Sequence, residues 1–259
     1  MKEIKKYLES RIGEYSFFFE DLKSGYVYGY NENVPMIAAG CMKLTIAVSL
    51  IKAVEDKKVD FMDKVKIQSG DKVYGTGIIH EFNEREYTVF ELLVIMLIQS
   101  DNTAANKIID IVGMEQINED IIAMGLKNTR LNRKTNDERT AITDVENITT
   151  AYDLSRIWKH LANGTFLSKD NGQMLIDILR RQQIKNKLAL YIPDDLKIEI
   201  SSKTGDKKGV ENDTAYLELP KGKFTFTVLS QDIPNSVYGT VSLAKCGKMM
   251  WDEVMNNWN

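Results

Sequence analysis

Apolar positions at the start of the chain change from a helical to an alternating pattern. Three aliphatic residues recur at helical spacing and predict an amphipathic helix over residues 2–12. Two apolar segments, residues 14–20 and 26–30, then flank a Ser24-Gly25 turn and predict a β-hairpin. The amino-terminal part therefore predicts one helix followed by two strands.

The middle of the chain keeps helical spacing through several segments. It predicts helices over residues 40–56, 89–99, 103–112, 115–124, 149–161 and 169–184. Residues 59–87 are mixed in pattern. Residues 128–147 are polar without a clear period and predict a long surface loop, which in a compact chain is more often functional or disordered than incidental.

Strand-like segments return near the carboxyl terminus. Residues 197–202, 215–219 and 224–231 predict three strands, and residues 242–257 a final helix. A hairpin at one end and a meander at the other imply one antiparallel sheet assembled from both termini, with helices inserted between them. We therefore expect an α/β protein of the α+β type. Its lobes would be residues 1–39 with 196–259, and an all-helical lobe of residues 40–195, with the active site in the cleft between them.

The composition is that of an ordinary globular protein, with 43% apolar and 27% charged residues. A net charge of −3 gives no electrostatic reason to expect nucleic acid or an anionic membrane as a partner, and we expect a monomer. Cys41 and Cys246 are predicted to be buried free thiols. His80 and His160 are too few for a metal site.

The first residues carry no signal-peptide pattern, and no run approaches the length of a membrane span. The sequence as written therefore predicts a cytoplasmic protein. An extracytoplasmic location is expected instead if Met1 was added to a trimmed mature chain.

One lysine lies in the first turn of an otherwise apolar helix, Lys43, and it must be solvated, paired or functional. It could extend its ammonium to solvent. The functional arrangement is Ser-x-x-Lys, in which a lysine of lowered pKa takes the proton of a serine three residues earlier. That position is Gly40, so the segment has a base and lacks a nucleophile.

Two further tripeptides follow in order, Ser100-Asp101-Asn102 and Lys203-Thr204-Gly205. Alone, the first would be a helix cap and the second a strand end with a turn glycine. Together with the Gly40–Lys43 segment they resemble the motifs of class A β-lactamases and penicillin-binding proteins. The resemblance covers nearly the whole chain and implies a sheet lobe, a helical lobe and a cleft between them.

The resemblance also implies roles for the residues of the chemistry. Gly40 occupies the nucleophile position, Lys43 matches the lysine that activates it, and Ser100 matches the hydroxyl that relays a proton to the leaving nitrogen. The backbone N–H groups of residue 40 and Asp206 would form the oxyanion hole. No metal or organic cofactor is implied.

Other residues match the family's substrate-binding positions. Asn102 resembles the amide that holds the acyl side chain, and Tyr74 resembles the aromatic residue at the cleft mouth. Lys203 and Thr204, followed by Gly205, resemble the segment that binds the substrate carboxylate. The implied ligand is a β-lactam or an acyl-D-Ala peptide.

The long loop departs from the class A pattern. Two residues beyond Arg133, where a glutamate would activate the deacylating water, the chain has Thr135. Glu138 lies three residues further on and could replace it, although it also fits a solvated carboxylate beside Arg139. Without this glutamate, a serine version is expected to form an acyl-enzyme and release it slowly, as a penicillin-binding protein does.

Three explanations compete for the glycine at position 40. The natural serine was replaced deliberately, the protein is a non-catalytic binder of β-lactams or peptidoglycan peptides, or other chemistry has taken over through Cys41 or water. Retention of Lys43 and Ser100, whose roles are proton transfer, favours the first. Cys41 is one residue off the lysine face and is expected to be inert. An amidase of the glutaminase type is a further alternative on the same fold.

Overall fold

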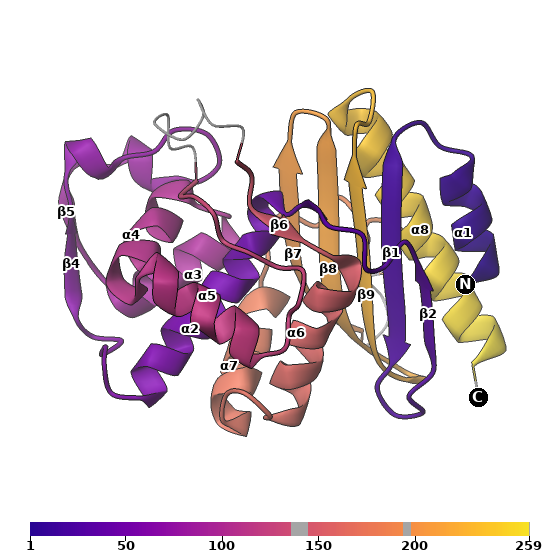
Figure 1. The fold of residues 1–259 in the computed structure, drawn as a ribbon, viewed down its shortest axis with the longest axis horizontal. Helices are drawn as coiled ribbons and strands as arrows, with labels where there is room; N and C mark the ends of the chain where they lie inside the picture. The colour runs from indigo at the N-terminus through magenta and orange to yellow at the C-terminus, as the bar shows by residue number, and fades with distance from the viewer. Residues whose placement is uncertain (136–144, 194–197, 259) are drawn as a thin grey trace.

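The computed structural model describes residues 1–135, 145–193 and 198–258. Its largest sheet has five antiparallel strands in the order β2-β1-β9-β8-β7 (Figure 1). The chain's start supplies the first two, and its end supplies the other three: β1 (Glu14–Asp21), β2 (Val27–Tyr30), β7 (Glu199–Lys207), β8 (Val210–Leu219) and β9 (Gly222–Gln231). Pairing of β1 with β9 joins the two ends, which confirms the predicted sheet built from both termini.

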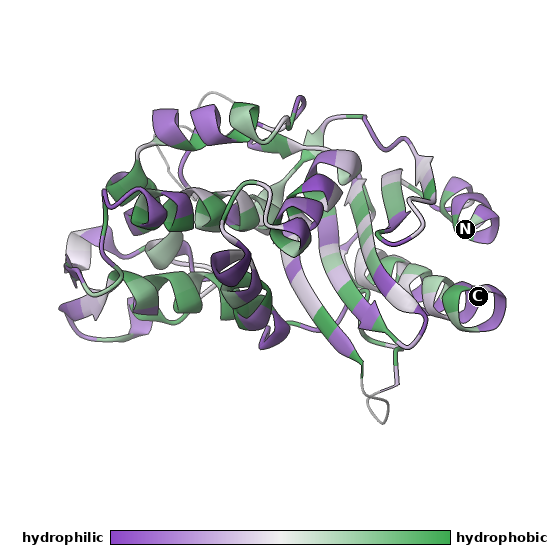
Figure 2. Cartoon of the chain, turned by 90° about the horizontal axis from the view of Figure 1, so that it is seen from below, coloured by the Kyte–Doolittle hydropathy of each residue, from purple (hydrophilic) through white to green (hydrophobic). Residues whose placement is uncertain are grey.

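Helices cover both faces of this sheet. The terminal helices α1 (Lys2–Glu9) and α8 (Ser236–Asn257) pack on one face, while α6 (Ala151–Asn163) and α7 (Lys169–Arg180) pack on the other (Figure 1). Successive side chains of a strand point to opposite faces. Phe17 and Phe19 accordingly belong to the core beneath α1 and α8, and Phe18 belongs to the other core. Hydrophobic and hydrophilic residues accordingly alternate along the strands in Figure 2.

The remaining helices form a second mass beside the free edge of β7 (Figure 1). Its central helix is α2 (Met42–Glu55), in which 11 of the 14 residues are buried. Because α2 is apolar almost all round, it can be covered by other helices on several sides. They are α3 (Val89–Ile98), α4 (Asn102–Val112), α5 (Met114–Ala123) and α7. The predicted helices are confirmed here within a few residues.

The inserted segment is not helical throughout, so the expectation of an all-helical lobe is wrong in that respect. It carries a two-stranded sheet of β4 (Lys64–Ile67) and β5 (Arg85–Thr88). Another short pair, β3 (Met36–Ile37) with β6 (Ile148–Thr149), ties the segment before position 40 to the end of the long loop. Four-residue strands give too little alternation to stand out from the mixed pattern of residues 59–87.

Three short 3₁₀ turns complete the described elements. They are η1 (Ala39–Cys41), which precedes α2, η2 (Ser69–Asp71) and η3 (Ile79–Glu81).

Two elements extend beyond their predicted limits. Strand β7 continues through Lys203-Thr204-Gly205, which therefore lie inside the strand and not at its end. Helix α8 begins six residues early because Asn235 caps it, accepting a hydrogen bond from the N–H of Tyr238.

The lobe boundaries at residues 39 and 195 stay a prediction, because α6 and α7 contact both the sheet and neighbouring helices. Within the described ranges, no helix is long and apolar enough to cross a membrane.

Candidate active site

Position 40 lies where three elements meet: η1, the turn between α3 and α4, and β7. A Cβ atom built on Gly40 would lie 2.8 Å from the carbonyl oxygen of Thr204 and 3.3 Å from Ser100 Oγ. Two non-glycine residues at this junction, Ala39 and Ser100, have positive φ angles of 46° and 54°. Such backbone strain persists only where the surrounding structure enforces it, and it clusters at functional sites.

Lys43 points into this junction and not to solvent. Its side chain is 3% exposed, and its Nζ donates to the Ser100 carbonyl at 2.5 Å, to Ser100 Oγ at 3.2 Å and to Asn102 Oδ1 at 2.8 Å. Burial, aided by the positive charge of Lys203, lowers the pKa of Lys43 to about 7. A large fraction of Lys43 is therefore neutral at neutral pH and able to accept a proton.

Ser100 lies between two buried lysines. Lys203 Nζ donates to Ser100 Oγ at 3.0 Å and to the carbonyl oxygen of Thr204 at 2.8 Å. Burial lowers the pKa of Lys203 to about 8. The Ser100 hydroxyl thus contacts two groups that exchange protons near neutral pH, which is the arrangement a proton relay requires.

The Ser100-Asp101-Asn102 tripeptide is both a helix cap and a part of the site, and different residues serve the two purposes. Asp101 caps α4 by accepting from the N–H of Ala104 at 2.8 Å, and it also accepts from the N–H groups of Ile78 and Ile79. Ser100 and Asn102, on either side of it, face Lys43. The cap holds the turn in the geometry that presents the other two side chains to the lysines.

An open cleft of about 220 Å³ begins at these residues. The cleft extends from the inner site to the loop and to the far end of β7. It is lined by Gly40 and by polar residues, which are Lys43, Thr76, Ser100, Asn102, Arg133, Lys134, Thr135, Glu146, Asn147, Asp206 and Lys207. Thr204 Oγ1 is buried and has no hydrogen-bond partner within the described part of the chain. A buried polar atom without a partner is unusual in a folded protein.

The loop positions are only partly described. Glu138 lies outside the described residues. Thr135, at the position of the expected glutamate, lines the cleft, and the Asn106 side chain holds it by accepting from its N–H at 2.8 Å and donating to its carbonyl at 3.0 Å.

Sequence reasoning missed one cleft carboxylate, Glu146. It accepts from Arg133 Nη2 at 2.9 Å and pairs with Lys207 across the cleft mouth. Burial raises the pKa of Glu146, but the hydrogen bonds from Lys207 and Arg133 outweigh it and the pKa is lowered. No sequence signal marks a contact between residues so far apart in a polar loop and a strand.

Cys41 is fully buried, and its thiol donates to the Lys203 carbonyl at 3.2 Å. Burial raises the pKa of Cys41 to about 12, so the thiol stays protonated. Cys41 and Cys246 are both buried and free, which confirms the prediction of two buried thiols. Tyr74 is 74% exposed with its ring 5.4 Å from that of His80, and Gly75 and Thr76 beside it line the cleft.

Comparison with known proteins identifies the family. A model of the β-lactamase enzyme family matches residues 1–254. The chain is 29% identical to β-lactamase SME-1 of Serratia marcescens over 143 residues, covering 54% of this chain and 49% of that protein. It is 26% identical to β-lactamase CARB-3 of Pseudomonas aeruginosa over 190 residues, covering 73% of this chain and 65% of that protein. The chain thus matches about half to about two thirds of the length of these curated relatives.

Solved structures show the same fold. The β-lactamase from Sphaerobacter thermophilus superimposes with a TM-score of 0.92 at 24% identity, covering 98% of this chain and 97% of that one. PBP-A superimposes with a TM-score of 0.89 at 23% identity, covering 98% and 95%. With the family model spanning almost every residue, the chain belongs to the β-lactamase enzyme family.

Proposed function

We propose that this chain is a class A β-lactamase-like protein whose cleft binds β-lactams or acyl-D-Ala amides and is built for acyl transfer to a serine at position 40. The observation that carries the proposal is the contact of both Lys43 and Lys203 with Ser100 Oγ, beside a Cβ position 3.3 Å from that same oxygen. A proton acceptor and a relay thus lie beside position 40, which has no side chain.

The chemistry follows from these contacts if position 40 carries a hydroxyl. Neutral Lys43 would take its proton while the oxygen bonds to the acyl carbon, and N–H groups of residue 40 and Asp206 would stabilise the oxyanion. The C–N bond then breaks, and Ser100 passes a proton to the leaving nitrogen. Lys203 and the free hydroxyl of Thr204 would bind the substrate carboxylate.

We also infer that glycine at position 40 replaces a serine of the active protein. Burying Lys43 and Lys203 together costs stability, because each must be desolvated near a like charge. A site that only bound ligands would need neither proton-transfer residue. The acyl-enzyme of the serine form should be long-lived, because Thr135 stands at the deacylation position and Glu146 is held in ion pairs. A variant of the structural relative PBP-A has been determined as an acyl-enzyme complex with penicillin G.

One observation favours a second function, binding without cleavage. The Cβ of any residue larger than glycine at position 40 would lie 2.8 Å from the Thr204 carbonyl oxygen, a backbone atom. The strand would have to move by a few tenths of an ångström to admit it. A natural glycine would remove this conflict and leave a site that holds its ligand unreacted.

Binding to the glycine protein tests the proposal without any chemistry. Titration calorimetry with benzylpenicillin is expected to show saturable binding that Lys203→Met weakens about tenfold or more, because a charge-assisted hydrogen bond is lost. Lys221→Met, an exposed lysine in the turn between β8 and β9, is the matched control and should bind as the parent does. Absence of binding to benzylpenicillin, with binding to a small amide such as glutamine, would support the amidase alternative instead.

A further inference from the structure

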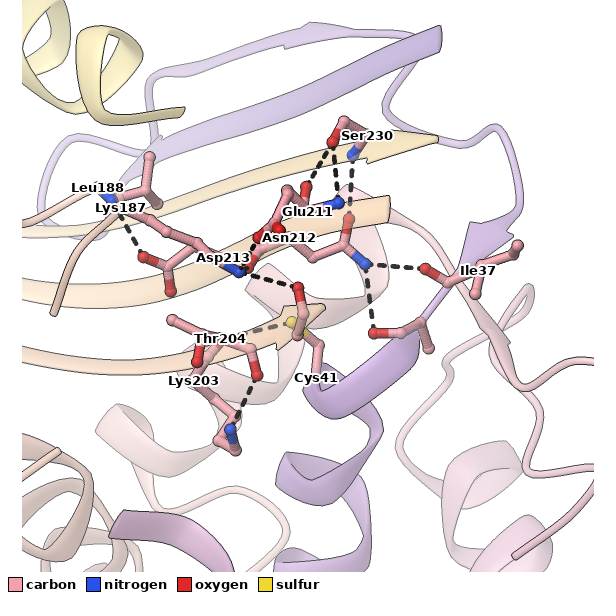
Figure 3. Close-up of polar contacts among 12 residues, drawn as sticks. Ile37, Cys41, Lys187, Leu188, Lys203, Thr204, Glu211, Asn212, Asp213 and Ser230 are labelled. Atoms are coloured by element: carbon pink, nitrogen blue, oxygen red, sulfur yellow. Dashed lines mark hydrogen bonds and ion pairs between the residues drawn. The ribbon is translucent and has the colours of Figure 1, made fainter. Parts of the chain in front are cut away.

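A buried ion pair lies directly behind β7. Lys187, in the segment that precedes the strand, has its Nζ 2.6 Å from Glu211 Oε2 of β8, and the two side chains are 2% and 4% exposed (Figure 3). Burying two charges is costly, and such a pair is often no better for stability than apolar residues of the same size. The location of the pair therefore calls for a reason other than stability.

The other two bonds of Lys187 show what the ammonium holds. Nζ donates to the carbonyl oxygen of Gly205 at 3.0 Å and to that of Asn212 at 3.2 Å (Figure 3). An ammonium has three donors, so Glu211 and these two carbonyls use all of them. Gly205 and Asn212 face each other in the antiparallel register of β7 and β8. Lys187 thus clamps the two strands at this step of the ladder.

The clamped carbonyl belongs to the peptide unit whose N–H, that of Asp206, is assigned to the oxyanion hole in the proposed function. The C=O of Gly205 and the N–H of Asp206 are parts of one planar unit and point in opposite directions. With the carbonyl turned to Lys187, the N–H is turned away from it, toward the free edge of β7. That edge lies against position 40, since a Cβ on Gly205 would be 2.8 Å from the backbone nitrogen of Gly40.

The neighbouring residue of β8 holds the opposite wall. Asn212 is fully buried, and its Nδ2 donates to the carbonyls of Ile37 at 2.8 Å and Ala38 at 3.3 Å, three and two residues before Gly40 (Figure 3). Its Oδ1 accepts from the N–H of Ser230 at 3.0 Å, which anchors the amide to β9. Both backbone segments that would supply oxyanion donors are therefore fixed from β8.

We propose that Lys187, held in place by Glu211, is a positioning residue of the oxyanion hole that orients and polarises the Gly205–Asp206 peptide. The inference rests on the proposed acyl-transfer function of the cleft. A cation on a carbonyl oxygen draws electron density from the amide, which makes the N–H of that same peptide a stronger donor. The clamp also fixes the N–H before any substrate arrives, and preorganised donors of this kind stabilise the transition state most.

The test uses the Gly40→Ser protein with three further changes. Lys187→Met combined with Glu211→Gln removes both charges of the ion pair, so that the Glu211 carboxylate is not left buried and unpaired. Lys187→Arg keeps the charge. Lys185→Met, an exposed lysine two residues away, is the matched control. Circular dichroism and thermal unfolding verify that each variant folds.

The acylation rate, the dissociation constant and the infrared band of the acyl-enzyme carbonyl distinguish a positioning role of Lys187 from a role in stability alone. The Lys187→Met/Glu211→Gln variant should acylate with benzylpenicillin about tenfold more slowly, with a dissociation constant within twofold, because the donor is weakened and not removed; complete loss of such a donor costs roughly 100- to 1,000-fold. The infrared band of the acyl-enzyme carbonyl should shift to higher frequency, and Lys187→Arg should restore part of both effects. Unchanged acylation and an unchanged band in a destabilised variant would overturn the inference.

A measurement on the glycine protein keeps this inference separate from the proposed function. The ¹H chemical shift of the Asp206 amide should move upfield in Lys187→Met/Glu211→Gln, and not in Lys185→Met. If the Gly40→Ser protein never reacts with penicillin but the amide shifts as expected, the clamp stands and the proposed function fails. If penicillin reacts and the amide does not shift, the clamp is wrong.

Discussion

Raising the pH from 7 to 8.5 should stabilise this protein, because two lysines are buried beside its cleft. The pKa of Lys43 is lowered to about 7 and that of Lys203 to about 8, first of all by burial. In the unfolded chain both have an ordinary pKa of about 10.4. Between these values the unfolded state binds more protons than the folded state, so the free energy of unfolding rises with pH.

The magnitude follows from the pKa values. Between pH 7 and pH 8.5 the free energy of unfolding should rise by about 2 kcal/mol from Lys43 and by about 1 kcal/mol from Lys203, because the unfolded chain binds more protons than the folded chain over this range. The prediction is limited to pH values up to 8.5 because of the buried thiols of Cys41 and Cys246, whose pKa values burial raises. At higher pH these thiols lose their protons in the unfolded chain but not in the folded one, which lowers the free energy of unfolding.

Urea unfolding of the glycine protein at four pH values measures this rise. Lys43→Met should remove about two thirds of it, by order of magnitude, since only the Lys203 contribution remains. Lys52→Met, an i,i+4 ion-pair residue on the same helix, should leave the slope unchanged, because its pKa is raised and it titrates above this window. A free energy of unfolding that is flat or falls over this range in the parent, or the same slope in Lys43→Met, would refute the assignment of Lys43 as a buried base.

Three further predictions concern the cleft. Gly40→Ala should lower the free energy of unfolding by about 1–2 kcal/mol in urea, although alanine favours helices, because its Cβ meets the Thr204 carbonyl at 2.8 Å; a more stable variant would contradict the close approach of β7. In the Gly40→Ser protein, Thr135→Glu should shorten the acyl-enzyme lifetime at least tenfold by mass spectrometry, since it places a carboxylate in the cleft lining; an unchanged lifetime would show that the loop does not present residue 135 to the water. Glu146→Gln in the same background should leave that lifetime within twofold, because Glu146 is bound to Arg133 and Lys207; a much longer lifetime would identify it as the base.

The predictable parts of the fold are those in which a periodic pattern coincides with burial. The strand β1, the helix α2 and the strand β9 are mainly apolar in sequence and mostly buried in the structure. Strand β8 was placed five residues too late, because Glu211, Asn212 and Asp213 interrupt its apolar run although they are buried. Their partners, such as Lys187, come from distant segments that no local pattern connects.

The candidate site was predictable where short motifs fix local geometry. Lys43, Ser100 and Lys203 were found from three motifs of three or four residues, and the structure brings all three side chains together. The bridge between Glu146 and Lys207 joins residues 61 positions apart and has no motif. Lys187 was missed for the same reason, since a lysine that follows the exposed residues Lys185 and Asn186 has no sign of burial in the sequence.

The most direct test of the central claim is the intact mass of the Gly40→Ser protein after mixing with benzylpenicillin, followed over time beside Gly40→Ala. We expect a persistent mass increase equal to one penicillin in Gly40→Ser, and no increase in Gly40→Ala or in the glycine protein. If Gly40→Ser folds and binds penicillin yet gains no mass, the cleft is not an acyl-transfer site lacking only its nucleophile.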